Sequence, residues 1–218
     1  MLDNHNNAIA VLDSGMGGIS ILKKLIKRGG EYIYYADNDY MPYGNKDPIQ
    51  LKQRLESIVD MLLTKYRVKS VIIACNTAST LLDNRDNIVT MQFQPNLTYL
   101  ATKLTKSKLA NVNIIADSTL ASLIERNICD RKAIDRIVRE HVKKYKLNKL
   151  DAFVLGCTHY ELVSDLFIKY CPNTQVFCNS DFIIPDIEYS SDDYIIHYIT
   201  SRQSLSYERM LAQLVGEV

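Results

Sequence analysis

The sequence has little of what most specialised protein classes need. Its 218 residues include 26 basic and 25 acidic ones, so no charge excess favours nucleic acid or an anionic membrane surface as a partner. The opening residues, MLDNHNN, form neither a basic nor an apolar leader region. No stretch approaches the ~18 uninterrupted apolar residues of a membrane span. We therefore expect a globular, cytoplasmic protein that binds neither nucleic acid nor membrane.

Paired cysteines are also lacking. The chain has five cysteines, an odd number, and no C-x-x-C pair. A disulfide framework, a compact zinc motif and a thioredoxin-like motif are therefore not indicated. Any function of these cysteines would be as thiols.

Glycine and proline are missing from the middle of the chain. No glycine occurs between Gly44 and Gly156, and no proline occurs between Pro95 and Pro172. Turns are therefore weakly marked there. Apolar residues at helical spacing over residues 120–142 predict one or two long helices. With 47% hydrophobic and 23% charged residues, the chain is long enough for one large or two small domains.

Short β-branched segments alternate with longer amphipathic ones. The strand-like segments are AIAVL (8–12), YIYYA (32–36), SVIIA (70–74), VNIIA (112–116) and DAFVL (151–155). The helical patterns include ISILKKLIKR (19–28) and PIQLKQRLESIVDMLLTKY (48–66). This alternation is typical of βαβ units around a parallel sheet with helices on both faces, so the predicted fold class is α/β. A domain boundary is expected near residues 90–95, where IVTMQFQP ends a strand.

A glycine-rich turn, VLDSGMGGIS (11–20), links the end of a strand to the start of a helix. Such turns often bind phosphate through backbone N–H groups, but neither the dinucleotide fingerprint nor the P-loop pattern fits here. Asp13 would also repel a phosphate. An amino acid suits the loop better, because its carboxylate can meet the N–H groups and its ammonium can meet Asp13.

Two strand ends carry matching chemistry. VIIACNTAST (71–80) and AFVLGCTHYELV (152–163) each deliver a cysteine after an apolar strand, followed by small polar residues and a helix pattern. Ligands bind at such strand ends in open α/β sheets. Two half-sites that face each other would place two thiols across one ligand.

Plainer readings of these residues stay open. A cysteine after an apolar strand is often a small buried hydrophobe, which accounts for Cys129, Cys171 and Cys178. It accounts less well for Cys75 and Cys157, because each lies in a polar cluster at a helix start, a setting that lowers a thiol pKa. His159 alone would more often be structural, and Asp13 could be a helix cap. Cys75, Cys157, His159 and Asp13 together could also form a zinc site, although their spacing matches no compact metal motif.

Four blocks in this order, DSGMGGIS, MPYGNK, ACNTAS and LGCTHY, resemble the signature blocks of glutamate racemase, in the aspartate/glutamate racemase superfamily. The tail YITSRQSLSYERMLAQLVG resembles the family's closing strand and helix. The resemblance implies two pseudo-symmetric parallel-sheet α/β domains with the active site in the cleft between them. We expect the first domain to comprise residues 1–92 plus 190–218, and the second to comprise residues 93–189.

The resemblance also implies a reaction. The enzyme would interconvert L-glutamate and D-glutamate, a peptidoglycan precursor, without a cofactor or metal. Inversion at Cα without an electron sink requires a base on one face and an acid on the other, and two thiols meet that need. By resemblance, Cys75 acts on the D-enantiomer with Asp13 assisting, and Cys157 acts on the L-enantiomer with His159 assisting.

The same resemblance assigns the substrate contacts. The amino and α-carboxylate groups would be held by Ser14, Asn76, Thr77 and Thr158. The side-chain carboxylate would be received by Pro42, Tyr43 and Gly44. The partner is therefore a small amino-acid substrate, and a homodimer is a candidate assembly that the sequence leaves open.

The middle of the chain departs from the family. The family's A-T-x-x-T block is matched to ADSTLAS (116–122), one residue tighter, and its C-P-x-F-V-P-L-V-E block, whose glutamate lies near the second cysteine, is missing. The two cysteines are 157 − 75 = 82 residues apart, a shorter separation than in the family, which indicates a trimmed second domain. Two alternatives follow: an isomerase for aspartate or another small acid, and a catalytically weakened amino-acid-binding relative.

Overall fold

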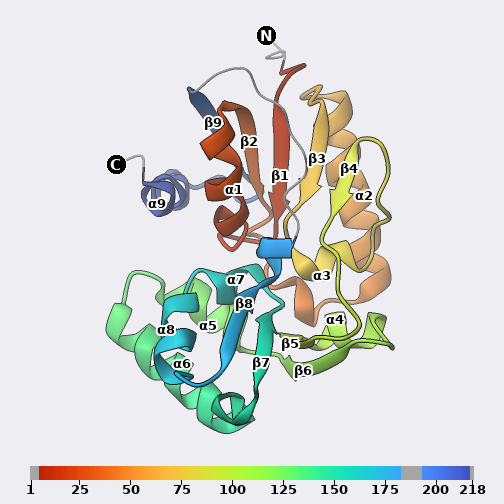
Figure 1. Cartoon of the computed structure of the whole chain (residues 1–218). Coiled ribbons are helices and arrows are strands. Elements are labelled where there is room, and N and C mark those ends of the chain that lie inside the picture. Colours follow the sequence, from red (N-terminus) through yellow and green to blue (C-terminus); the bar gives the residue numbers. More distant parts are fainter. Residues whose placement is uncertain (1–4, 183–192, 217–218) are drawn as a thin grey trace.

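The computed structural model describes residues 5–182 and 193–216, which form two parallel β-sheets (Figure 1). The first sheet has the strand order β4-β3-β1-β2-β9 and the second has the order β6-β5-β7-β8. The strands are β1 (Ile9–Asp13), β2 (Gly30–Ala36), β3 (Ser70–Ile73), β4 (Ile88–Thr90), β5 (Thr98–Thr102), β6 (Asn113–Asp117), β7 (Ala152–Leu155), β8 (Gln175–Cys178) and β9 (Tyr194–Thr200). Every strand pair is parallel, as the alternating pattern predicts.

Helices connect these strands. They are α1 (Ile19–Leu25), α2 (Pro48–Thr64), α3 (Asn76–Ser79), α4 (Lys103–Lys108), α5 (Leu120–Asn127), α6 (Arg131–Tyr145), α7 (Thr158–Glu161), α8 (Ser164–Tyr170) and α9 (Leu205–Val215). The segment predicted as one or two helices forms two, because the Asp130 side chain accepts hydrogen bonds from the N–H groups of Lys132 and Ala133 and so begins α6.

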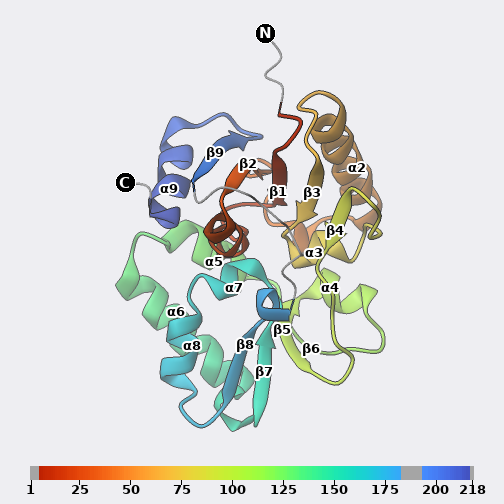
Figure 2. The ribbon, with the colours of Figure 1, turned by 45° about the horizontal axis from the view of Figure 1, so that its top comes forward.

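Helices cover both faces of the first sheet. One face packs on the apolar side of α2, where Leu51, Leu55 and Leu62 are buried. The other face packs on α1 and α9, which contribute buried side chains that include Leu22 and Leu211. Figure 2 shows β9, which comes from the end of the chain, beside β2. The edge strand β9 of the first sheet therefore follows all strands of the second sheet in the sequence.

The second sheet is covered differently. One face packs on α5, α6 and α8 around Phe153 and Phe167. The opposite face, with Tyr99 and Val154, packs on side chains of the connecting segments, such as Phe93 and Leu109. Within residues 5–182 and 193–216, this apolar cluster contains no helical side chain, so the expectation of helices on both faces is not met for this sheet.

The carboxyl ends of β1 and β3 point toward the half of the molecule that holds the second sheet, and α3 and α7 lie between the two halves (Figures 1 and 2). In the described ranges 5–182 and 193–216, no helix has the length and apolar character needed to cross a membrane. The boundaries expected for the two domains stay a prediction.

Candidate active site

Both cysteines singled out by the sequence precede a short helix at the boundary between the sheets. Cys75 follows β3 and occupies the N-cap of α3, and Cys157 follows β7 and occupies the N-cap of α7. Their exposed fractions are 6% and 7%. Backbone N–H groups at a helix start stabilise negative charge. Each sulfur therefore lies beside the first backbone N–H groups of a short helix.

A hydrogen bond joins the two halves at this boundary. Asp13, the last residue of β1, is completely buried, and its Oδ2 accepts a hydrogen bond of 3.0 Å from Thr158 Oγ1. Its Oδ1 accepts one of 2.9 Å from the N–H of Gly15. The glycine loop also packs tightly on α7, because a Cβ at Gly17 would collide with Thr158 Oγ1. A side chain at position 17 would thus push the loop away from α7.

The environment of Cys75 favours the protonated thiol. Burial raises the pKa of Cys75 well above its usual range, and the charges of Asp13 and Cys157 raise it further, while backbone N–H groups of α3 offset part of this effect. The thiol donates a long hydrogen bond of 3.9 Å to the buried Ser14 hydroxyl. The pKa of Asp13 is itself raised by burial, although the nearby His159 opposes that shift. This half-site holds a proton donor beside a carboxyl group that can accept a proton.

The second half-site contains a buried histidine. Burial lowers the pKa of His159, but its hydrogen bonds to Cys157 and Glu125 outweigh burial and raise that pKa well above the ordinary value. The bond between His159 Nε2 and Glu125 Oε2 is 2.6 Å long. This shift favours the cationic form of the ring, which lies between Glu125 and Cys157.

Glu125 is the functional candidate that sequence analysis missed. It lies on α5 and receives hydrogen bonds from His159, from the Met16 N–H at 3.2 Å and from the Tyr207 hydroxyl. Burial raises its pKa, yet these hydrogen bonds outweigh burial and lower it. One signal was available: Glu125 follows the buried Ala121 by four residues, so it lies on the inward edge of an amphipathic helix.

Asn76 carries a buried amide whose hydrogen bonds are incomplete. Its Oδ1 accepts a hydrogen bond of 2.5 Å from Asn179 Nδ2. Its Nδ2 is buried with no hydrogen-bond partner within the part of the chain that the structure describes. A buried donor left in this state costs about 1–3 kcal/mol, which a bound acceptor would recover.

Residues 42–44, which the sequence predicts to bind the side-chain carboxylate of the substrate, do not offer a free tyrosine hydroxyl. The Tyr43 hydroxyl donates a hydrogen bond of 2.8 Å to Asp37 Oδ2, and Asp37 also pairs with Arg54 at 2.5 Å. The phenol is thus already used within the first half. Pro42 precedes Tyr43, and a Cβ at Gly44 would lie 2.7 Å from the Thr102 Cβ, so this loop reaches the end of β5.

The zinc site considered from the sequence, at Asp13, Cys75, Cys157 and His159, needs ligand atoms that lie close to one another. Within residues 5–182 and 193–216, three ligand atoms come within 4.8 Å of one another only at His5, Glu31 and His197. The four residues considered for zinc from the sequence do not form such a group.

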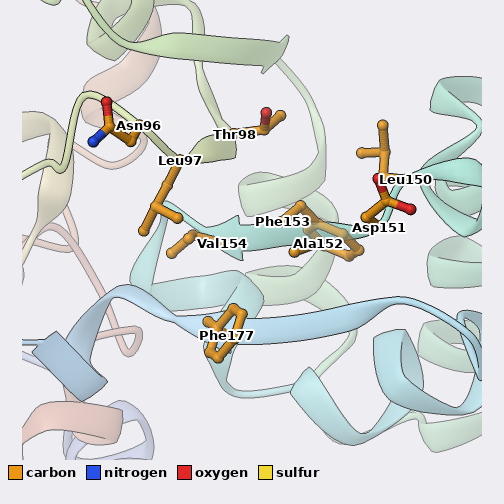
Figure 3. Close-up of a pocket in the computed structure, with 9 residues that line it drawn as sticks. All are labelled: Asn96, Leu97, Thr98, Leu150, Asp151, Ala152, Phe153, Val154 and Phe177. Carbon is orange, nitrogen blue, oxygen red and sulfur yellow. The ribbon is translucent and has the colours of Figure 1, made fainter.

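A pocket of about 280 Å³ lies elsewhere in the second half (Figure 3). Leu97, Val154 and Phe177 line it, together with residues at the amino ends of β5 and β7. Cys157 follows the opposite, carboxyl end of β7. This pocket is therefore not part of the cysteine site.

Known proteins are similar to this chain over most of its length. No family model matches it. A glutamate racemase of Clostridium acetobutylicum is 30% identical over 91% of this chain and 89% of that protein. A glutamate racemase of Aliarcobacter butzleri is 31% identical over 74% of each. The chain belongs to the glutamate racemase family.

Solved structures of the glutamate racemase family share the fold. Isoform RacE1 of Bacillus anthracis superposes with a TM-score of 0.78 at 19% identity, over 97% of this chain and 95% of that one. The enzyme of Thermus thermophilus, solved with β-chloro-D-alanine, also gives 0.78, at 21% identity, over 98% and 94%. The architecture of two α/β domains is therefore that of the family.

The A-T-x-x-T pattern occurs without a missing residue at 101–105, ATKLT. Thr102, the last residue of β5, and Thr105, in α4, bring their hydroxyls to within 3.0 and 3.3 Å of the Thr77 hydroxyl. The segment first matched to this pattern, 116–122, ends the edge strand β6. There Asp117 accepts hydrogen bonds from the first N–H groups of α5 and from Tyr145. Its role is to cap a helix.

This chain lacks the C-P-x-F-V-P-L-V-E sequence. The carboxylate that contacts His159, which is itself hydrogen-bonded to Cys157, comes from Glu125 on α5.

Proposed function

We propose that this protein interconverts L-glutamate and D-glutamate by moving the Cα proton between two thiols, Cys75 and Cys157. The observation that supports the proposal is the matched pair of cysteines, each buried at a helix start. The charge of Asp13 acts on Cys75, and His159 is hydrogen-bonded to Cys157, so each thiol has a candidate acid or base partner. The family's name agrees with this reaction.

The raised pKa values of Cys75 and Asp13 are consistent with one order of proton transfers. In the L-to-D direction, Cys157 removes the proton of L-glutamate and Cys75 delivers its own proton to the opposite face. The raised pKa of Cys75 keeps that proton in place until the carbanion forms. In the D-to-L direction, Asp13 receives the thiol proton of Cys75, which its own raised pKa permits. Both faces then have a competent group, as inversion requires.

The cationic ring of His159 has two roles in this proposal. It donates a hydrogen bond to the Cys157 sulfur, which stabilises the thiolate before the reaction, and it returns a proton when Cys157 acts as the acid. Glu125 holds the ring in the cationic form and in one orientation. Hydrogen bonds from Met16 and Tyr207 in turn hold Glu125, so the orientation is defined by both halves of the chain.

Substrate groups are assigned to the polar residues at the same boundary. We propose that the unpartnered Nδ2 of Asn76 binds the α-carboxylate, with Ser14, Thr77 and Thr158 around the amino and carboxylate groups. Because the Tyr43 hydroxyl is occupied by Asp37, the 42–44 loop would bind the side-chain carboxylate through the backbone N–H groups of Tyr43 and Gly44, since Pro42 has none.

The test is proton–deuterium exchange at Cα of L-glutamate and D-glutamate in heavy water, with purified protein freed of metal and organic cofactor. Exchange accompanied by inversion of the optical signal is expected. Aspartate is assayed in parallel. Exchange with aspartate but not glutamate would establish the aspartate-type alternative, and binding without exchange would establish the amino-acid-binding relative.

Two organisational proposals accompany this function. We propose domains of residues 1–92 plus 190–218 and of residues 93–189, each contributing one cysteine. We also propose a homodimer, which light scattering after size-exclusion chromatography would distinguish from a monomer. A measured mass near 24.9 kDa would refute the dimer.

A further inference from the structure

Two histidines and a glutamate converge on the first sheet, away from both cysteines. His5 precedes β1, Glu31 is the second residue of β2, and His197 lies in the middle of β9. In the parallel register Ile33 pairs with His197, so Glu31 and His197 lie on the same face of the sheet. Three segments far apart in the sequence thus present one ligand group each to one place.

The ligand atoms of this cluster are close together. His5 Nδ1 lies 2.6 Å from Glu31 Oε1, and His197 Nε2 lies 3.0 Å from the same oxygen. The centroids of the two imidazole rings are 4.7 Å apart. His5 is buried, whereas the side chains of Glu31 and His197 are 30% and 41% exposed. A small ion could therefore reach the cluster from solvent.

We propose that His5, Glu31 and His197 bind one Zn²⁺ ion. Two imidazoles and one carboxylate are a ligand set that zinc accepts, with water or another small ligand in the fourth position. Metal–ligand distances of about 2.0–2.2 Å in a tetrahedral site place ligand atoms about 3.3 Å apart. The two hydrogen-bond distances, 2.6 and 3.0 Å, are shorter than this by about 0.7 and about 0.3 Å, so the ion requires the side chains to rotate apart by less than 1 Å.

Charge and tautomer suit a divalent cation. With neutral imidazoles the three side chains carry one negative charge, which offsets half the charge of Zn²⁺. Each ring must present a lone pair at the nitrogen nearest Glu31 and carry its proton on the other nitrogen. A proton that lies between Glu31 and His5 Nδ1 or His197 Nε2 moves to the other nitrogen of that ring or to solvent when the metal binds.

The bound ion would fasten the edge of the first sheet. It would tie β9, which returns from the second half of the chain, to β2 and to the segment before β1. Glu31 is five residues before Ala36, the end of β2, which is roughly 16 Å along a strand. Ala36 pairs with Asp13, so the zinc site lies at the opposite end of the sheet from the cysteines. Its expected effect is on stability rather than on proton transfer.

The test is Zn²⁺ binding to the untagged, full-length protein after removal of metal by a chelator. Calorimetry should give one tight Zn²⁺ site per chain, and Zn²⁺ should raise the unfolding midpoint. His197→Asn and Glu31→Gln each remove one ligand. Since even partners that only orient a ligand contribute 10–100-fold to metal affinity, each variant should weaken binding by at least about 100-fold.

The matched control is His141→Asn, which removes an imidazole on α6 outside the cluster. It should keep both the tight site and the Zn²⁺-dependent rise in unfolding midpoint. Each midpoint is compared with and without Zn²⁺ for the same variant, so a change in intrinsic stability does not affect the result.

Cobalt distinguishes this site from the cysteines. Co²⁺ bound by nitrogen and oxygen should show visible ligand-field bands without an intense sulfur-to-metal charge-transfer band. A sulfur band, equal Zn²⁺ affinity in His197→Asn, or the absence of tight Zn²⁺ binding would each overturn the proposal. None of these outcomes depends on whether the protein racemises glutamate.

Discussion

Tyr207, near the start of the last helix, donates its hydroxyl hydrogen to Glu125 on α5. The two residues come from opposite ends of the fold, since α9 packs on the first sheet and α5 packs on the second. The chain Tyr207–Glu125–His159–Cys157 therefore links the C-terminal helix to one of the two thiols. The first prediction follows from this contact.

Tyr207→Phe should keep the fold and lower turnover by about tenfold, which corresponds to roughly 1.4 kcal/mol of barrier. The hydrogen bond from Tyr207 helps to lower the pKa of Glu125, so its loss raises that pKa. The acid limb of the pH–rate profile should then move to higher pH. Tyr170→Phe removes a similar hydroxyl–carboxylate bond, to Asp135, which is not part of the chain from Tyr207 to Cys157, and it serves as the control. An acid limb unchanged from wild type would contradict the prediction.

The second prediction concerns the division of labour between the thiols. Cys75→Ser and Cys157→Ser should each nearly abolish racemisation, because a serine hydroxyl does not ionise at neutral pH and inversion needs a group on both faces. With a glutamate analogue that bears a leaving group next to Cα, one deprotonation suffices for elimination. Cys75→Ser should then process the L-analogue, and Cys157→Ser should process the D-analogue.

Product formation is followed for both enantiomers with both variants. If each variant loses elimination equally for the two enantiomers, the cysteines do not serve opposite faces. The wild-type protein, which should process both enantiomers, verifies that the analogue is accepted.

The third prediction separates catalysis from the metal cluster. Chelation should leave glutamate turnover unchanged, since the proposed proton transfers use thiols, Asp13 and His159. In protein loaded with Zn²⁺, the same treatment should lower the unfolding midpoint. Both quantities are measured on one sample before and after chelation. Loss of turnover that zinc restores would favour a catalytic metal instead.

The fourth prediction concerns Glu161, a buried residue of α7. Burial raises its pKa to about 7, although hydrogen bonds from the Ser180 hydroxyl at 2.5 Å and the Ser180 N–H at 3.1 Å oppose the shift. A carboxyl group whose pKa is raised in the folded state binds more protons than it does when unfolded. Its contribution to stability is therefore complete below the unfolded pKa and is lost as pH rises through about 7.

Glu161→Gln removes this titration while retaining the shape of the side chain. Between pH 4 and pH 8, the free energy of unfolding of wild type should fall relative to the variant by about 3 kcal/mol, because the pKa of Glu161 is about 7 in the folded state and 4.5 in the unfolded state. Urea unfolding at several pH values measures this difference. A constant difference across that range would refute the prediction.

Sequence patterns predicted the local structure well. The segments at 8–12, 32–36, 70–74, 112–116 and 151–155 all form strands, each displaced by at most two residues from the observed bounds. Periodicity succeeds because burial of alternating or continuous apolar side chains is decided mainly by near neighbours in the sequence. The shared setting of Cys75 and Cys157 was visible for the same reason, since a strand end and the following helix start are local features.

β5 shows where local reasoning failed. Its sequence, TYLAT, is short and is followed by the lysine-rich KLTKSK of α4, so neither its apolar pattern nor its ends stand out. Once the strand is placed between β6 and β7, Thr102 and Thr105 come to Thr77. The A-T-x-x-T pattern at 101–105 is visible in the sequence, whereas the contact of its threonines with Thr77 depends on how the strands are arranged.

By itself, the sequence determined the α/β class, the family blocks and the two strand ends that carry thiols, because each is encoded in a few consecutive residues. Only the tertiary structure decided that Glu125 orients His159, that Tyr207 reaches Glu125, and that His5 and His197 meet at Glu31. The separations in sequence are 34 residues for Glu125 and His159, 82 for Glu125 and Tyr207, 26 for His5 and Glu31, and 166 for Glu31 and His197. Hydrophobic periodicity selects the face on which a residue lies, whereas strand order and helix packing select which distant residue it meets.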